Sequence, residues 1–102
     1  MGTEIHHRGA TVPCRVWWVK HDTGVEYTPD QSSTITIFDT DGAAIAAVTD
    51  EAMTELSTGI VYYHWATLTT QAKGDYTFKA IGTDGTGTGE TVQYAYGSFR
   101  LT

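Results

Sequence analysis

The chain of 102 residues carries a net charge of −6, from twelve acidic and six basic side chains. This length provides one hydrophobic core, so we expect a single domain over residues 1–102, with 1–8 as an extended arm. The acidic balance argues against nucleic-acid binding, and no apolar run approaches the ~20 residues of a membrane span. With 19 Thr, 7 Val, 6 Ile and 12 aromatic residues, the composition favours strands over helices.

A first strand is expected over residues 11–20 (TVPCRVWWVK). Trp17 and Val19 fall on one face of this strand. The opposite face carries alternating apolar residues and is predicted to be the core face, formed by Val12, Cys14, Val16 and Trp18.

The middle of the chain is expected to begin with a strand over 34–39, with Ile35 and Ile37 pointing inward. The dipeptide Asp41-Gly42 indicates a tight turn, and residues 43–48 are expected to form the return strand of a hairpin. Residues 49–56 are expected to form a loop with one helical turn, because the helix-like segment is under two turns long.

Three further strands are expected over 58–67, 74–81 and 90–101, with a glycine-rich hairpin tip at 83–89. The strand over 58–67 has large apolar groups on both faces, so the sequence does not decide which face points to the core. One face carries Ile60, Tyr62, His64 and Ala66, and the other carries Val61, Tyr63, Trp65 and Thr67. In the last strand, one alternating set is Val92, Tyr94 and Tyr96, and the other is Gln93, Ala95 and Gly97. Six or seven short strands without interleaved helices predict an all-β fold, an antiparallel β-sandwich.

Three segments carry a resemblance to a known family: residues 33–42 (STITIFDTDG), 57–65 (STGIVYYHW) and 74–78 (GDYTF). Together they resemble a recurrent immunoglobulin-like module, found in bacterial and archaeal surface proteins and in virion proteins of tailed phages. The resemblance covers residues 8–101. Within it, Tyr76 resembles the tyrosine corner of such domains, and Phe78 takes the place of the second core cysteine. The chain departs from antibody domains because it lacks their core disulfide.

This resemblance implies an immunoglobulin-like β-sandwich of about seven strands. The start of the chain lacks the apolar segment of a secretory signal, so we expect synthesis in a host cytoplasm and a place in the virion. The implied function is that of a structural protein of a tailed phage, a neck, tail or capsid decoration subunit. Its expected partners are other virion structural proteins and copies of itself, with no nucleic acid and no membrane. The alternative is a binding or adhesion module that recognises a glycan or a cell-surface ligand.

The residue types that bind metals do not occur at ligand spacing. The four histidines, His6, His7, His21 and His64, form no H-x-x-x-H pair, and the single Cys14 excludes a disulfide within the chain and a multi-cysteine zinc site. Asp39 and Asp41 could begin a calcium loop, but the Asp-Gly dipeptide that follows favours a hairpin turn. We therefore predict no metal and no cofactor.

Catalytic constellations are also missing from the sequence. Cys14 falls on the predicted core face, where a thiol is an inert apolar group. Ser57 and His64 lack the G-x-S-x-G context of a serine nucleophile. The glycines from 82 to 89 do not form G-x-G-x-x-G and precede a strand, so a hairpin tip is favoured over a phosphate cradle. We predict that the protein is not an enzyme.

Aromatic residues give the strongest functional signal, because one sandwich core uses only one face of each strand. The residues predicted to contact a partner from the other face are Trp17, Val19, Tyr63 and Trp65. The alternative is a second minor core covered by a loop of the same chain.

Overall fold

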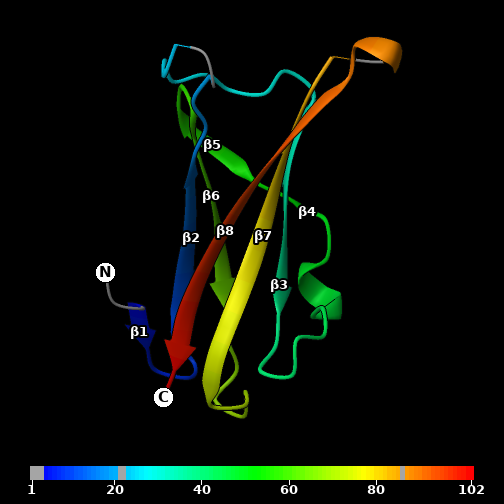
Figure 1. Cartoon of the computed structure of the whole chain (residues 1–102). Coiled ribbons are helices and arrows are strands. Elements are labelled where there is room, and N and C mark those ends of the chain that lie inside the picture. Colours follow the sequence, from blue (N-terminus) through cyan, green and yellow to red (C-terminus); the bar gives the residue numbers. More distant parts are fainter. Residues whose placement is uncertain (1–3, 21–22, 86) are drawn as a thin grey trace.

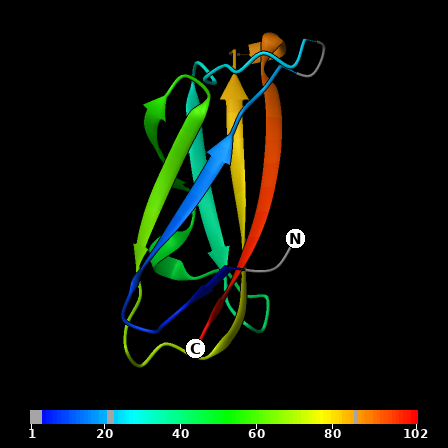
Figure 2. The same ribbon diagram turned by 90° about the vertical axis from the view of Figure 1, so that its left-hand side faces the viewer.

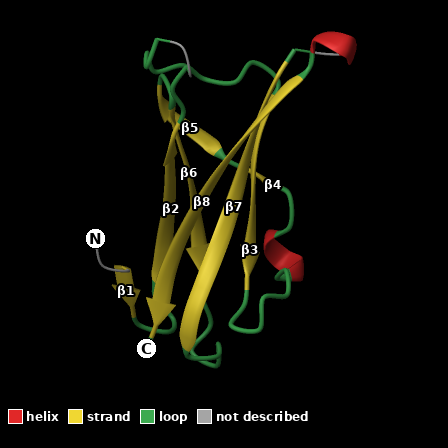
Figure 3. Cartoon of the chain, viewed as in Figure 1, coloured by secondary structure: helices red, strands yellow, loops and turns green. Residues whose placement is uncertain are grey.

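The computed structural model describes residues 4–20, 23–85 and 87–102, and places nearly all regular structure in strands (Figure 3). Two sheets face each other (Figure 1). The larger has the order β1-β8-β7-β3-β4 and the smaller the order β2-β6-β5. The strands are β1 (Glu4–His6), β2 (Thr11–Trp17), β3 (Ser32–Phe38), β4 (Glu51–Ala52), β5 (Thr54–Ser57), β6 (Ile60–Ala66), β7 (Gly74–Asp84) and β8 (Thr91–Leu101), with short 3-10 helices η1 (Ala46–Val48) and η2 (Gly87–Gly89). The predicted all-β fold is confirmed, as two sheets packed in the manner of a β-sandwich.

Alternation of buried and exposed residues is strictest in β2. Along this strand every second residue is buried, and the predicted core face is confirmed by Val12, Cys14, Val16 and Trp18, all at most 5% exposed. In β3, Ile35 and Ile37 are fully buried, as expected. The strand is flanked by β7 on one side and by the two-residue β4 on the other.

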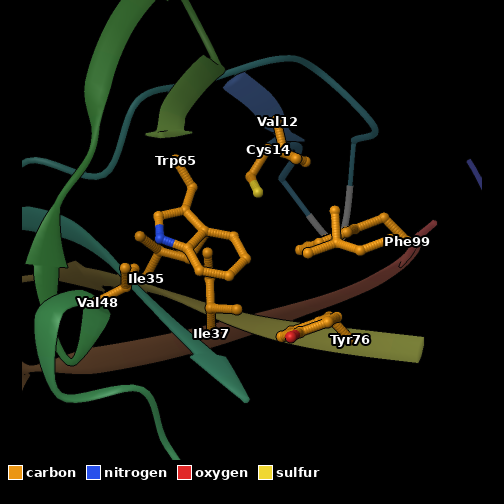
Figure 4. Close-up of a cluster of buried hydrophobic side chains, with 9 residues drawn as sticks. Val12, Cys14, Ile35, Ile37, Val48, Trp65, Tyr76 and Phe99 are labelled. Atoms are coloured by element: carbon orange, nitrogen blue, oxygen red, sulfur yellow. The ribbon is translucent and has the colours of Figure 1, made fainter. Parts of the chain in front are cut away.

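Aromatic rings from three strands form the centre of the core (Figure 4). Tyr76 and Phe99 stack in nearly parallel planes, with their centroids 5.5 Å apart. Trp65 comes from the opposite sheet and lies against both rings, at 5.6 and 6.0 Å. The Tyr76 hydroxyl donates a hydrogen bond to the Ala72 carbonyl at 2.7 Å, so its polar end is satisfied at the edge of the core.

The segment between β3 and β6 differs from the sequence prediction. Residues 43–48 form no return strand, because only Ala44 bridges to Phe38 before the chain turns into η1 and inserts Val48 into the core. Residues 49–56 are not a helical loop either. They form β4, which pairs with β3, and then most of β5, which pairs with β6. The chain changes sheets at the half-buried Met53, whose N–H donates to the Ser33 carbonyl at 2.9 Å.

The predicted extended arm is part of the larger sheet where it is described. β1 pairs in parallel with the end of β8, with Glu4 opposite Phe99 and His6 opposite Leu101. The pairing continues past the strand, since Thr102 N–H donates to the His6 carbonyl at 2.9 Å and Arg8 N–H donates to the Thr102 carbonyl at 3.1 Å. Beyond Phe99, toward the start of β8, no described strand covers this edge.

Candidate docking surface

On one side of the sandwich, β2 is the edge strand of the smaller sheet, and β8, with β1 along its last residues, is at the edge of the larger sheet; Figure 2 shows the molecule from this side. A surface groove runs there, which we call the side groove. It combines three aromatic side chains with one acidic and one basic side chain. Its lining residues are Glu4, Pro13, Arg15, Trp17, Phe78, Tyr96, Gly97 and Ser98.

Two of the four predicted contact residues lie on the predicted outer face. Trp17 is 55% exposed and lines the side groove, and Val19 is 43% exposed just beyond the end of β2. Their position follows from the alternation of β2, which turns Cys14 and Val16 inward and Trp17 outward. Across the β2–β6 pairing, Trp17 lies opposite Ile60. Contact with a partner stays a prediction.

The other two predicted contact residues lie on the opposite face, so the expectation that grouped Tyr63 and Trp65 with Trp17 is wrong. Tyr63 pairs with Cys14 and Trp65 pairs with Val12, which places both on the core side of β6. Trp65 is only 6% exposed, and Tyr63 is half-buried against the same core. The sequence could not decide between the faces of β6, because both carry large apolar groups.

A stripe of exposed residues on β8 was missed by the sequence prediction. Val92, Tyr94 and Tyr96 are 41%, 57% and 75% exposed, and the Lys79 ammonium lies 5.8 Å from the centroid of the Tyr94 ring. We call these three β8 residues the tyrosine stripe. A signal for it was present in the sequence. The buried Phe99 and the other odd-numbered residues of β8 face inward, which leaves the even-numbered set outside.

The floor of the side groove depends on a glycine. A Cβ atom at Gly97 would collide with the ring of Phe78, which lies over this position from the neighbouring strand. The ring therefore fills the space that a side chain at 97 would take. Phe78 and Gly97 both line the groove, together with Trp17 and Tyr96.

The end of the sandwich above the groove is held by polar contacts. Tyr27 donates from its hydroxyl to Asp84 Oδ2 at 3.0 Å and accepts from the side-chain amide of Gln93. Asp84 Oδ1 accepts from the Asp30 N–H at 2.8 Å, and Asp30 Oδ1 accepts from the Gly85 N–H at 2.9 Å. These hydrogen bonds connect the β2–β3 loop to the β7–β8 hairpin, at the end of the strands that carry Trp17 and Tyr94.

The candidate metal residues are dispersed. His6 lies edge-on to Phe99, His7 Nδ1 contacts Thr102 Oγ1, and His64 is exposed beside Tyr62, whereas His21 lies outside the described residues. Among the described residues, no three His, Cys, Asp or Glu side chains come together as a possible metal site.

Asp39 begins the tight turn that the sequence predicts. Its Oδ1 atom accepts hydrogen bonds from the N–H groups of Asp41 at 2.9 Å and Ala43 at 3.0 Å, and Gly42 has φ 85°. One carboxylate oxygen of Asp39 is therefore already used within the turn.

The two candidate nucleophiles lack activation. Cys14 is 1% exposed, and burial, with a smaller contribution from the negative charge of Glu4, raises the pKa of its thiol to about 12. The thiol therefore stays protonated at neutral pH, and the thiolate is the reactive form. Ser57 pairs with Ile60 at the β5–β6 turn, and no hydrogen bond between Ser57 and His64 is present in the described part of the chain.

No protein-family model matches the chain, and neither a curated protein nor a solved structure matches it. In the described ranges, no helix has the length and hydropathy needed to cross a membrane.

Proposed function

We propose that this chain is an immunoglobulin-like structural protein of a tailed-phage virion, which docks in several copies on a larger neck, tail or capsid component. The observation that carries the proposal is the side groove with the tyrosine stripe beside it. Together they place Trp17, Tyr94 and Tyr96 in solvent on a β-sheet frame. Exposed aromatic groups of this kind are enriched at protein–protein interfaces.

The strand order supports the immunoglobulin-like part of the proposal. If β2 is strand B, the chain continues as C (β3), C′ (β4), D (β5), E (β6), F (β7) and G (β8). The sheets then contain G-F-C-C′ and B-E-D, the groupings of immunoglobulin domains. Tyr76 lies near the start of strand F, and its hydroxyl bonds to a carbonyl four residues upstream, as in a tyrosine corner.

The two core-cysteine positions of that fold support the same assignment. Cys14 lies on the B strand, and Phe78 lies on the F strand two residues after Tyr76. Phe78 packs against the core and covers Gly97, so an aromatic ring takes the place of the second sulfur. The three segments with the family resemblance fall on β3 and its turn, on β5–β6 and on β7.

The virion part of the proposal is tested on particles. Particles are purified from cells that carry the gene and analysed by quantitative mass spectrometry. The proposal expects the chain in fixed ratio to a neck, tail or capsid protein. Its absence from intact particles would refute the virion function while leaving the fold assignment standing.

The second candidate function is recognition of a glycan or a cell-surface ligand, favoured by the exposure of Trp17 and Tyr96 at the side groove, since aromatic faces stack on sugar rings. A glycan array separates the two. Retention on one class of glycan that Trp17→Ala and Tyr96→Ala abolish would favour the alternative. The control is Leu68→Ala, because Leu68 is an exposed apolar residue just after β6, at the end of the β2–β6 pair opposite to Trp17, and does not line the groove.

A further inference from the structure

The first half of β8 is an edge strand without the usual protection. Natural sheets protect their edges with very short strands, charged side chains, Pro or bulges. The other edges show these devices: β4 has two residues, β5 has an irregular register at Glu55/Ser57, and β2 carries Pro13 and Arg15. Residues 91–98 of β8 contain no charge and no Pro, and their register with β7 is continuous.

The backbone direction shows which groups this edge presents. Both the N–H and the C=O of Thr102 bond toward β1. Since these groups alternate between the two sides of a strand, those of the even-numbered residues of β8 point to the same side, away from β7. The groups of Val92, Tyr94 and Tyr96 therefore point to the open edge. No described strand pairs with β8 at these positions.

We propose that this edge binds the same edge of a second copy of the chain, with the two β8 strands antiparallel about a two-fold axis at Tyr94. In this register Tyr94 pairs with its own counterpart, and Val92 pairs with Tyr96 of the other copy. Val92, Tyr94 and Tyr96 then all exchange hydrogen bonds through their outward-pointing backbone groups, so the edge is self-complementary. This inference deepens the proposed function, on which it rests for its biological purpose, by naming one partner as the chain itself.

Local charge and space both allow a second copy. The net charge of −6 on each copy opposes association, but residues 91–98 carry no charged side chain, so the pairing places no like charges opposite each other across the two strands. The described part of β1 begins opposite Phe99, whereas the added strand ends opposite Gly97. The described part of β1 and the added strand therefore occupy successive parts of one edge. The added strand would lie along the side groove beside Trp17.

The area indicates the strength of this contact. Residues 91–97 extend over about 24 Å at ~3.4 Å per residue, and the smallest dimension of the molecule is 20 Å. The contact therefore covers roughly 500 Å² of each copy, about 1,000 Å² in total, at the low end for specific interfaces. We expect a weak, concentration-dependent dimer, which the local concentration in a multi-copy particle would strengthen.

Sedimentation velocity and amide hydrogen exchange of the purified chain test the proposal. As the concentration rises from about 10 µM to about 1 mM, which brackets the dissociation constant of a weak dimer, the protein should pass from monomer to dimer. Over that range the N–H groups of Val92, Tyr94 and Tyr96 should become protected from exchange. Those of Gln93 and Ala95 face β7 and should be protected throughout. A monomer at every concentration, or protection without this alternation, overturns the proposal.

A matched pair of double variants tests the register. Val92→Lys with Tyr96→Glu places opposite charges across the two-fold axis, whereas Val92→Lys with Tyr96→Lys places like charges there. The like-charge double variant should dimerise at least about tenfold more weakly than the opposite-charge one, because both cross-strand contacts change from attraction to repulsion. Its lower net negative charge would act in the opposite direction. Equal affinities would overturn the register.

Thr77→Lys is the control for packing through the sheet face. Thr77 is exposed on β7, an interior strand of the same sheet, so the variant should dimerise like the unmodified chain. If Thr77→Lys disrupts the dimer as strongly as the like-charge pair, the copies meet through the face, and the edge proposal is wrong. A monomer that still enters particles refutes only the self-pairing, whereas a dimer absent from particles refutes only the virion function.

Discussion

Two adjacent tryptophans give a sharp test of the inward and outward faces of β2. Trp18 is 2% exposed and Trp17 is 55% exposed. An aromatic side chain of this size buries up to ~250 Å², and burial contributes ~25 cal/mol per Å². The upper limit is therefore about 6 kcal/mol for Trp18 and about 3 kcal/mol for Trp17. After subtraction of the burial that Ala retains, we expect losses of about 4 kcal/mol for Trp18→Ala and about 1 kcal/mol for Trp17→Ala.

The free energy of unfolding is measured by urea titration, followed by far-ultraviolet circular dichroism because this signal does not depend on the substituted fluorophore. A domain of this size has a stability of ~5–15 kcal/mol, so Trp18→Ala should leave a marginal fold. Trp17→Ala should keep a sharp transition close to that of the unmodified chain. Equal losses for the two variants would refute the reasoning, because Trp17 would then be a core residue.

A third variant at the same site separates packing from polarity. The Trp18 indole N–H is buried and has no hydrogen-bond partner among the described residues. An unsatisfied buried donor costs about 1–3 kcal/mol, so Trp18→Phe removes this penalty together with part of the ring. We expect the two effects to offset each other to within about 1 kcal/mol. A loss as large as that of Trp18→Ala would show that the N–H is satisfied.

Three further predictions concern the core. Burial raises the pKa of Cys14 from 9.0 to about 12, so the stability that the neutral thiol contributes should be intact below pH ~9 and lost as the pH rises toward about 12. The loss should reach up to ~1.4 kcal/mol per pH unit in urea titrations. A Cys14→Ala chain titrated in parallel should lack this component of the decline. Gly97→Ala should destabilise the fold by about 1–3 kcal/mol in thermal unfolding, because the added Cβ meets the Phe78 ring. Phe78→Leu in the same chain should recover part of that loss. Equal stability of Gly97→Ala and the unmodified chain would contradict the packing of Phe78 over Gly97. Tyr76→Phe should lose about 1 kcal/mol in urea titration, since the Ala72 carbonyl loses its donor, and an unchanged midpoint would show that water replaces the hydroxyl.

The strands with one apolar face could be predicted from the sequence. In β2, the alternation that ends at Trp18 determines the buried set, and in β3 the isoleucines do the same. The core face of β6 could not be predicted in this way. Tyr62 and Tyr63 are both large and apolar, so only the pairing of Tyr63 with Cys14 across the sheet shows which one faces the core.

Segments whose structure depends on distant partners were beyond local patterns. β4 has two residues and exists because β3 offers a free edge, and the turn before it needs a positive φ of 52° at Asp50, which no motif indicates. β1 depends on β8, more than ninety positions away. Only part of the candidate surface could be predicted. The exposure of Trp17 follows from the alternation within its own strand, whereas the exposure of the tyrosine stripe follows only once the buried Phe99 shows which alternate residues of β8 face the core.

The pairing of β1 with β8 also predicts an order in which the strands of the molecule fold. Glu4 meets Phe99 only after a loop of about 95 residues closes, which costs ~4 kcal/mol of chain entropy when it forms from an otherwise open chain. The β7–β8 hairpin closes over a short tip and has no such barrier. We therefore expect this hairpin to form early, β1 to dock last, and folding to take milliseconds to seconds, as for other sheets built from distant segments. In the interval before β1 docks, the whole outer edge of β8 is open, and the nascent chain is then most prone to pair with the wrong neighbour.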